Sequence, residues 1–255
     1  MNNSLPSLED IFGKRISTIK YIPRNVRSVF AKCVTSALAN INLENSMAAW
    51  TEFFMLPKAL LNNIYSKGKK HRKHMESSIK NRCTRWLNNE RKTLWDELVD
   101  LKTKINKENV PNEERIIREA KALCHEGQFS KASKRLISDP LCEVNEWSIN
   151  QMKVKHPKSN TMSTCNPKTC NETHLPTDKQ VSSSLFTFPK GSAPGPTSLR
   201  PQHLIDALNS NIRYDFLEQL TGVCNILAQG KAPKVLAKFL AGANLIGSPK
   251  KDTSK

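Results

Sequence analysis

The stretch that decides the fold runs Phe188-Pro-Lys-Gly-Ser-Ala-Pro-Gly-Pro-Thr-Ser-Leu-Arg-Pro-Gln-His-Leu204, and Ala243-Asn-Leu-Ile-Gly-Ser-Pro-Lys-Lys251 follows it further along the chain. Its glycines and prolines predict a tight loop from Gly191 to Arg200, followed by a helix with Pro201 in its first turn. Two interpretations of this loop stay open. Its backbone N–H groups and Arg200 could hold a phosphate, or the loop could be a rigid turn that only positions the helix. It is not a P-loop, since no Gly-Lys-Ser/Thr ends it.

The residues around this loop predict a domain over 178–255. Apolar residues recur at helical spacing before and after the loop, and an alternating pattern then indicates a strand. Lys250 and Lys251 close that strand. The expected elements are helices over 178–185, 212–228 and 233–239 and a strand over 242–249.

The upstream residues predict helices throughout. We expect an N-terminal helical hairpin as domain 1–65, in which Pro57 bends or ends the second helix, and a basic helical region as domain 66–154. The helices are expected over 23–43, 46–56, 75–106 and 144–154, with a helical hairpin over 113–137 that turns at Gly127.

A basic run at 66–74 contains Lys69, Lys70, Arg72 and Lys73. Two functional interpretations apply to it, a nuclear-localisation signal and an arm that binds phosphates. The structural alternative is a solvated loop that happens to be basic.

Trp86 and Trp95 lie in the long helical pattern that follows, interleaved with arginines. Such tryptophans could stack on bases. Their helical spacing with leucines favours a place in the core instead.

Residues 155–177 are mainly Pro, Ser, Thr, Asn and Lys, which predicts a disordered linker. The stretch carries Cys165 and Cys170, with His156 and His174 nearby. Two thiols and two imidazoles could bind zinc, but the spacing matches no retroviral knuckle. An unstructured spacer without metal is the favoured interpretation.

The net charge of +17 over 255 residues predicts a polyanionic partner, RNA or DNA, because a basic surface attracts phosphates and releases their counterions. Lys238 interrupts the best apolar stretch, 235–246, so we expect no membrane span. The N-terminus shows no signal peptide, which predicts an intracellular protein, nuclear or cytoplasmic.

The loop and the later lysines resemble the entry to the fingers subdomain of reverse transcriptases from non-LTR retrotransposons. There a Gly-Ser-Ala-x-Gly-Pro-Asp-Gly-like loop leads into a helix, and an Ala-x-Leu-Ile-x-x-x-Lys-Lys strand follows. The resemblance covers 177–255 well and 20–156 more loosely. It implies that Lys250 and Lys251 contact phosphates and that the complete enzyme is an RNA-directed DNA polymerase that uses Mg²⁺.

The chain departs from that family in two respects. Thr197-Ser198 stands where relatives usually have Asp-Gly, and the family's Phe/Leu-x-x-x-Asp and Tyr/Phe-x-Asp-Asp motifs are missing. Polymerase chemistry needs clustered carboxylates that hold two metal ions. We therefore assign no catalytic, metal-binding or cofactor-binding residue and expect no polymerase activity from this chain.

These observations predict a mainly α-helical protein with extended linkers and a partial fingers segment. The predicted function is that of a truncated, retrotransposon-derived reverse-transcriptase fragment that binds nucleic-acid phosphates. The alternative is a stand-alone basic helical protein that binds nucleic acid or acts as a scaffold. The residues predicted to contact nucleic acid are Lys69, Lys70, Arg72, Lys73, Arg200, Lys250 and Lys251.

Overall fold

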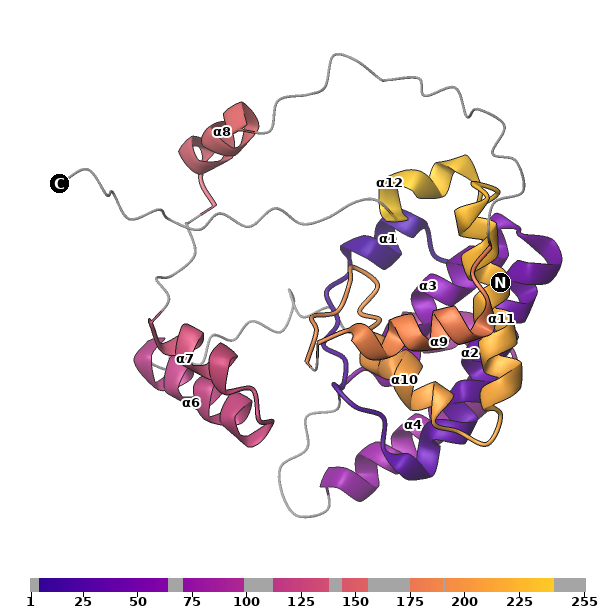
Figure 1. Ribbon diagram of the computed structural model, residues 1–255, viewed down its shortest axis with the longest axis horizontal. Helices are drawn as coiled ribbons and strands as arrows, with labels where there is room; N and C mark the ends of the chain where they lie inside the picture. The colour runs from indigo at the N-terminus through magenta and orange to yellow at the C-terminus, as the bar shows by residue number, and fades with distance from the viewer. Residues whose placement is uncertain are drawn as a thin grey trace. The chain divides into compact units, whose positions relative to one another are not determined.

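The computed structural model describes residues 5–63, 71–98, 112–137, 144–155, 175–189 and 191–240. These residues are mainly helical and contain no strand; Thr18 and Asn62 form an isolated antiparallel bridge. They fall into two compact units (Figure 1). The first unit combines the described residues before 99 with those after 174, and the second comprises the described residues between 112 and 155.

The first unit is a helical bundle. In chain order its helices are α1 (Leu8–Gly13), η1 (Arg24–Val26), α2 (Arg27–Glu44), α3 (Met47–Leu61), α4 (His71–Leu87), α5 (Arg91–Asp96), α9 (Asp178–Thr187), α10 (Pro201–Leu208), α11 (Arg213–Ala228), η3 (Lys234–Leu236) and α12 (Ala237–Leu240).

Helix α2 lies at the centre of this bundle and contacts α3, α4, α10 and α11. The helix predicted over 23–43 is confirmed, and apolar residues that recur along it at helical spacing are almost fully buried. They are Phe30, Cys33, Val34, Ala37, Leu38 and Ile41.

Helix α3 packs against α2, as the predicted hairpin requires, but it does not end at Pro57. It continues to Leu61 with Pro57 inside it, so the predicted end was wrong. A proline inside a helix removes one backbone hydrogen bond. Burial of Leu56, Leu60 and Leu61 offsets that loss, since all three are at most 1% exposed.

The single long helix expected over 75–106 is interrupted at Asn89 within the described residues. Asn89 adopts a positive φ of 65°, which asparagine tolerates better than most residues, and α5 begins two residues later. This turn lets both Trp86 and Trp95 enter the core, where they are 1% and 6% exposed. The prediction that these tryptophans belong to the core is confirmed. The alternative, that they stack on bases, was wrong, because their rings are buried.

Helices from far along the chain complete the same bundle. Helices α10 and α11 pack directly on α2, and α9 packs on both of them. At Gly222 the approach is so close that a Cβ atom would lie 2.6 Å from Asn42 Oδ1. Described residues of the segments 1–65 and 178–255, expected as separate domains, therefore share one hydrophobic core.

The second unit contains α6 (Asn112–His125), α7 (Phe129–Ile137) and α8 (Glu146–Lys155). Helices α6 and α7 form the hairpin predicted from the sequence, and Gly127 between them adopts a φ of 71°. The predicted strand over 242–249 and residues 156–174 of the predicted linker 155–177 lie outside the described residues. The linker's first residue, Lys155, belongs to α8, and its last, Thr177, caps α9.

Candidate nucleic-acid interface

The Gly191–Arg200 loop is held by hydrogen bonds of its own. The N–H groups of Ser192, Gly195 and Ser198 donate to Pro189 O, Leu199 O and Gly195 O at 3.1, 3.1 and 2.8 Å. These donors already have acceptors inside the chain. The contacts fit the rigid-turn interpretation of the loop better than the phosphate cradle.

Ser198 lies in the loop with a backbone conformation that usually favours glycine. Its φ is +66°, a left-handed conformation that glycine adopts without a steric cost. Two hydrogen bonds hold the buried serine there: its Oγ donates to Ile16 O at 3.2 Å, and Thr18 Oγ1 donates to Ser198 O at 3.2 Å. These bonds attach the loop to the segment before α2.

Helix α10 is also bonded to the segment before α2, through His203, which is fully buried. Its Nδ1 accepts from the Arg200 N–H at 3.3 Å, so its Nε2 carries the proton and donates to Ile19 O at 2.8 Å. Burial lowers the pKa of His203 to about 4, because the charged imidazolium loses its hydration. The ring is therefore neutral near pH 7, and its two hydrogen bonds connect the start of α10 to the segment before α2.

Asp206 lies one turn further along α10 and is 1% exposed. It accepts from the Ile22 N–H at 2.7 Å and pairs with Arg27 Nη2 at 2.6 Å. Burial raises its pKa, while the Ile22 N–H and the Arg27 guanidinium act in the opposite direction. Sequence reasoning missed His203, Asp206 and Arg27. The available signal was a histidine and an aspartate on the apolar stripe of a short helix.

Arg200, one of the residues predicted to contact nucleic acid, is half-buried. Its Nη1 donates to Ser192 O at 3.0 Å, across the loop. The side chain therefore braces the loop in this structure.

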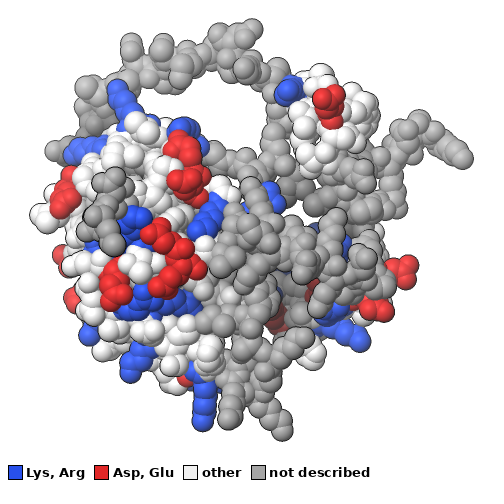
Figure 2. All heavy atoms as spheres, turned by 180° about the vertical axis from the view of Figure 1, so that it is seen from behind, with Lys and Arg blue, Asp and Glu red and all other residues white. Residues whose placement is uncertain are grey.

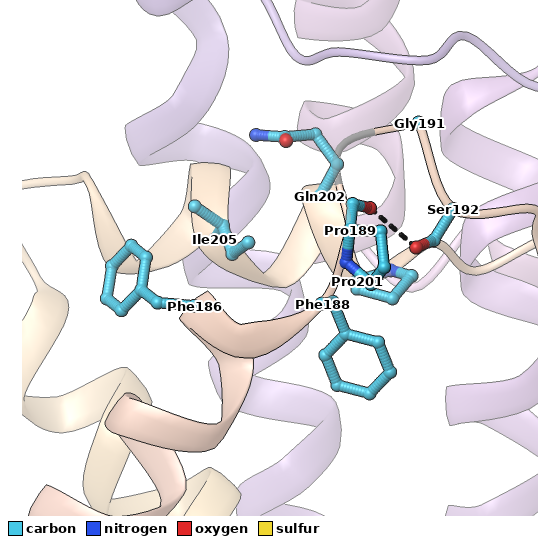
Figure 3. A pocket seen from close by; sticks show the side chains of 8 residues that line it. All are labelled: Phe186, Phe188, Pro189, Gly191, Ser192, Pro201, Gln202 and Ile205. Atoms are coloured by element: carbon cyan, nitrogen blue, oxygen red, sulfur yellow. Dashed lines mark hydrogen bonds between the residues drawn. The ribbon is translucent and has the colours of Figure 1, made fainter. Parts of the chain in front are cut away.

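A shallow hollow of about 240 Å³ lies beside the loop. The rings of Phe186 and Phe188 at the end of α9 border it, and a hydrogen bond from Ser192 Oγ to Pro189 O at 2.6 Å fixes one wall (Figure 3). Ile205 and Gln202 of α10 also line it. None of the described residues that line the hollow has a charged side chain.

The end of the basic run forms the first turn of α4. Arg72, Lys73 and His74 are exposed there, and Lys80 is exposed two turns further on. Positive side chains are unfavourable at a helix N-terminus, where the helix dipole is itself positive. Glu76 in the second turn of α4 is the nearest acidic residue of this helix. It accepts hydrogen bonds from Asn25 Nδ2 at 3.1 Å and from Arg72 Nε at 3.0 Å, and these bonds lower its pKa.

Lys73 and Lys80 are seven residues apart, so they project from the same side of α4 about 10 Å apart along the axis. Glu76 lies between them on this side, three residues after Lys73 and four before Lys80. It accepts hydrogen bonds from Asn25 and Arg72, and the charge of Lys73 also lowers its pKa. This side of α4 therefore presents two exposed ammonium groups with one carboxylate between them.

The remaining predicted contact residues, Lys69, Lys70, Lys250 and Lys251, lie outside the described residues. So do His156, Cys165, Cys170 and His174 of the zinc hypothesis. Among the residues that are described, no group of three or more His, Cys, Asp or Glu side chains is placed to hold a metal ion. Likewise, none of the described helices has the length and apolar character needed to cross a membrane.

The charges of the described surface are mixed. On the face drawn in Figure 2, lysine and arginine atoms lie next to aspartate and glutamate atoms. Ion pairs of the described residues include Arg85 with Glu97 at 2.6 Å and Lys92 with Asp96 at 2.8 Å. The positive charges are therefore not gathered into one continuous patch on this face.

No family model, curated protein or solved structure matches the chain. The likeness to reverse transcriptases stays a prediction from the sequence.

Proposed function

We propose that this chain binds RNA or DNA through its phosphates and that the first turns of α4 form the central contact. The supporting observation is the exposed pair Lys73 and Lys80 on one side of α4, directly after the lysines of the basic run. Two such cations can replace condensed counterions on a phosphate backbone. The net charge of +17 adds long-range attraction to the same partner.

In this proposal the chain is a retrotransposon-derived fragment of a reverse transcriptase, intracellular and without polymerase activity of its own. The loop at 191–200 and the Ala243-Asn-Leu-Ile stretch support the origin. The missing aspartate motifs support the lack of activity, since nucleotide transfer needs carboxylates that hold two metal ions. Mg²⁺ belongs to the complete family enzyme and is not required for binding by this chain.

Binding to a labelled single-stranded RNA and to a DNA duplex tests the first part. The variant Lys73→Glu/Lys80→Glu is expected to weaken binding about tenfold or more at low salt, because two attractive contacts become repulsive. The matched control is Lys153→Glu/Lys155→Glu on α8, which removes two exposed lysines with the same change in net charge. Equal losses in both variants would show that only net charge matters and would refute a site on α4.

A primer-extension assay on the isolated chain tests the second part. The expected result is no incorporation of nucleotides with Mg²⁺ and a primed RNA template. Robust incorporation would contradict the proposal.

The second candidate is a stand-alone basic helical protein that binds nucleic acid or acts as a scaffold. One observation favours it: α9, α10 and α11 complete a helical core with α2, so the described part of the fingers-like segment is packed without a palm. A transcript in which the reading frame continues past Lys255 into Arg-Pro-Ile and then an Asp-Asp motif would favour the fragment. An expressed, spliced transcript with a stop codon there would favour the stand-alone protein.

A further inference from the structure

The side of α4 that faces away from the core has a composition of its own. Met75, Ile79 and Trp86 are buried and mark the core side of this helix. The outer face of α4, on the opposite side, consists of six exposed residues, none of them acidic. They are Lys73, Ser77, Lys80, Asn81, Thr84 and Asn88. The outer face is therefore polar throughout and positively charged.

Glu76 borders the outer face, although it stands between the two lysines in sequence. At about 100° per residue, Glu76 lies about 60° around the helix from Lys73, and Asn81 lies about 80° from Lys73 in the opposite sense. Glu76 accepts hydrogen bonds from Arg72 and Asn25. The carboxylate therefore flanks the lysines on one side, and the uncharged residues of the outer face flank them on the other.

The outer face also offers an amide to a partner. Asparagines elsewhere in the bundle bond within the chain: the side chains of Asn42 and Asn45 donate to backbone carbonyl groups more than 170 positions away. Asn81 is instead exposed, with Ser77 one turn before it and Thr84 one turn after it. An asparagine amide both donates and accepts, which is the pair of groups that adenine requires in the major groove of DNA.

The dimensions of the outer face suit a groove of duplex DNA. Lys73 and Thr84 are eleven residues apart, so the face between them is about 17 Å long. The major groove of B-DNA is about 12 Å wide and admits an α-helix. The major groove of duplex RNA is deep and too narrow for side chains to read. In the view of Figure 1, α4 lies at the edge of the first unit, where a duplex can reach it.

We propose that the partner of α4 is duplex DNA and that the outer face lies in its major groove. The inference rests on the proposed function, because it assigns the lysines of α4 to phosphates. Lys73 and Lys80 contact the backbone and place the helix, and the Asn81 amide forms two hydrogen bonds with an adenine. The C-terminal end of α4 stays outside the groove, because Glu90 and Glu97 pair there with a single arginine and leave a net negative charge.

Selection from a library of random DNA duplexes by the full chain tests the contact with a base. The wild type is expected to enrich a short sequence that contains adenine. Asn81→Ala, checked for folding by circular dichroism, is expected to lose about tenfold of the preference at that base pair, because both hydrogen bonds are gone. Asn211→Ala changes an exposed asparagine between α10 and α11 and is expected to select the wild-type sequence. A wild type that enriches no sequence, or an Asn81→Ala variant that selects the same one, would overturn the proposal.

Competition between nucleic acids of one sequence tests the choice of duplex DNA. Duplex DNA is expected to bind the full chain more tightly than duplex RNA or single-stranded DNA does. Lys73→Gln/Lys80→Gln is expected to weaken binding to every duplex and to keep the selected sequence, because phosphate contacts carry no sequence information. Tighter binding to duplex RNA or to single strands would overturn this proposal and leave the phosphate contact standing. A double lysine variant that binds as tightly as the wild type would overturn the proposed function as well.

Discussion

The Gly191–Arg200 loop and the basic run that ends in α4 were both predicted as possible phosphate sites. They differ in the structure, because the polar groups of the loop bond to the chain itself and the lysines of α4 are exposed to solvent. In the loop, the backbone donors and Arg200 bond to neighbouring residues of the chain, and Ser198 bonds to the segment before α2. On α4, Lys73 and Lys80 are exposed. A loop rich in glycine and proline therefore stabilises the fold here, whereas the basic helix α4 is the surface that we propose for an anion.

The largest effect is expected from Asp206→Ala, which tests the structural role of α10. The substitution leaves the Ile22 N–H and the Arg27 guanidinium without their carboxylate, so we expect a loss of about 3 kcal/mol in the free energy of unfolding. Urea denaturation measures it. The control is Asp215→Ala on the exposed side of α11, where a change below about 0.5 kcal/mol is expected. Similar losses in both variants would contradict the structural role.

His203 is expected to make stability depend on pH. Its pKa in the folded protein, about 4, is below the ordinary value of 6.5, so the unfolded chain binds the proton more readily. Stability is therefore fully present above pH 6.5 and falls as pH decreases towards 4, by about 1.4 kcal/mol per pH unit at most.

The variant His203→Gln isolates this contribution. Asp206 has the opposite sign, because its raised pKa makes its contribution fall as pH rises through the window above 3.8. Comparing His203→Gln with the wild type at each pH removes the part due to Asp206. The difference in unfolding free energy is expected to shrink as pH falls from 6.5 towards 4. A difference that is constant with pH would show that the buried ring does not carry this proton linkage.

A smaller effect is expected at Ser198. Ser198→Ala keeps the left-handed backbone but loses the hydrogen bond to Ile16 O, so we expect a destabilisation of about 1 kcal/mol. Ser198→Gly loses the same bond but removes the steric cost of a positive φ, which is about 1 kcal/mol. Glycine is therefore expected to be more stable than alanine at this position by thermal or urea unfolding. The reverse order would argue against a strained backbone.

Local patterns in the sequence predicted most of the helices. The stripe of α2, the turn at Gly127 and the start of α10 at Pro201 each follow from helical spacing or from a residue with special backbone angles. Where prediction failed, distant contacts decided the outcome. Burial of Leu60 and Leu61 stabilises the last turn of α3 beyond Pro57. The turn at Asn89 allows Trp95 to be buried.

The candidate site was less predictable. Sequence alone identified Arg72 and Lys73 as basic, but not that Glu76 pairs with Arg72 while Lys73 is exposed. Nor could it show that Arg200 turns back to Ser192 O, or that His203 and Asp206 bond to residues more than 180 positions earlier. Partners so distant in sequence meet only when the chain packs.

The salt dependence of DNA binding tests the central claim most directly. The slope of log K against log salt is measured for the wild type, for Lys73→Gln/Lys80→Gln on α4 and for Arg200→Gln in the loop. We expect the α4 variant to reduce the slope by about 1.8, since each lost phosphate contact removes about 0.9. The Arg200 variant, checked for folding by circular dichroism, is expected to keep the wild-type slope. A reduced slope for Arg200→Gln with an unchanged slope for the α4 variant would contradict the account.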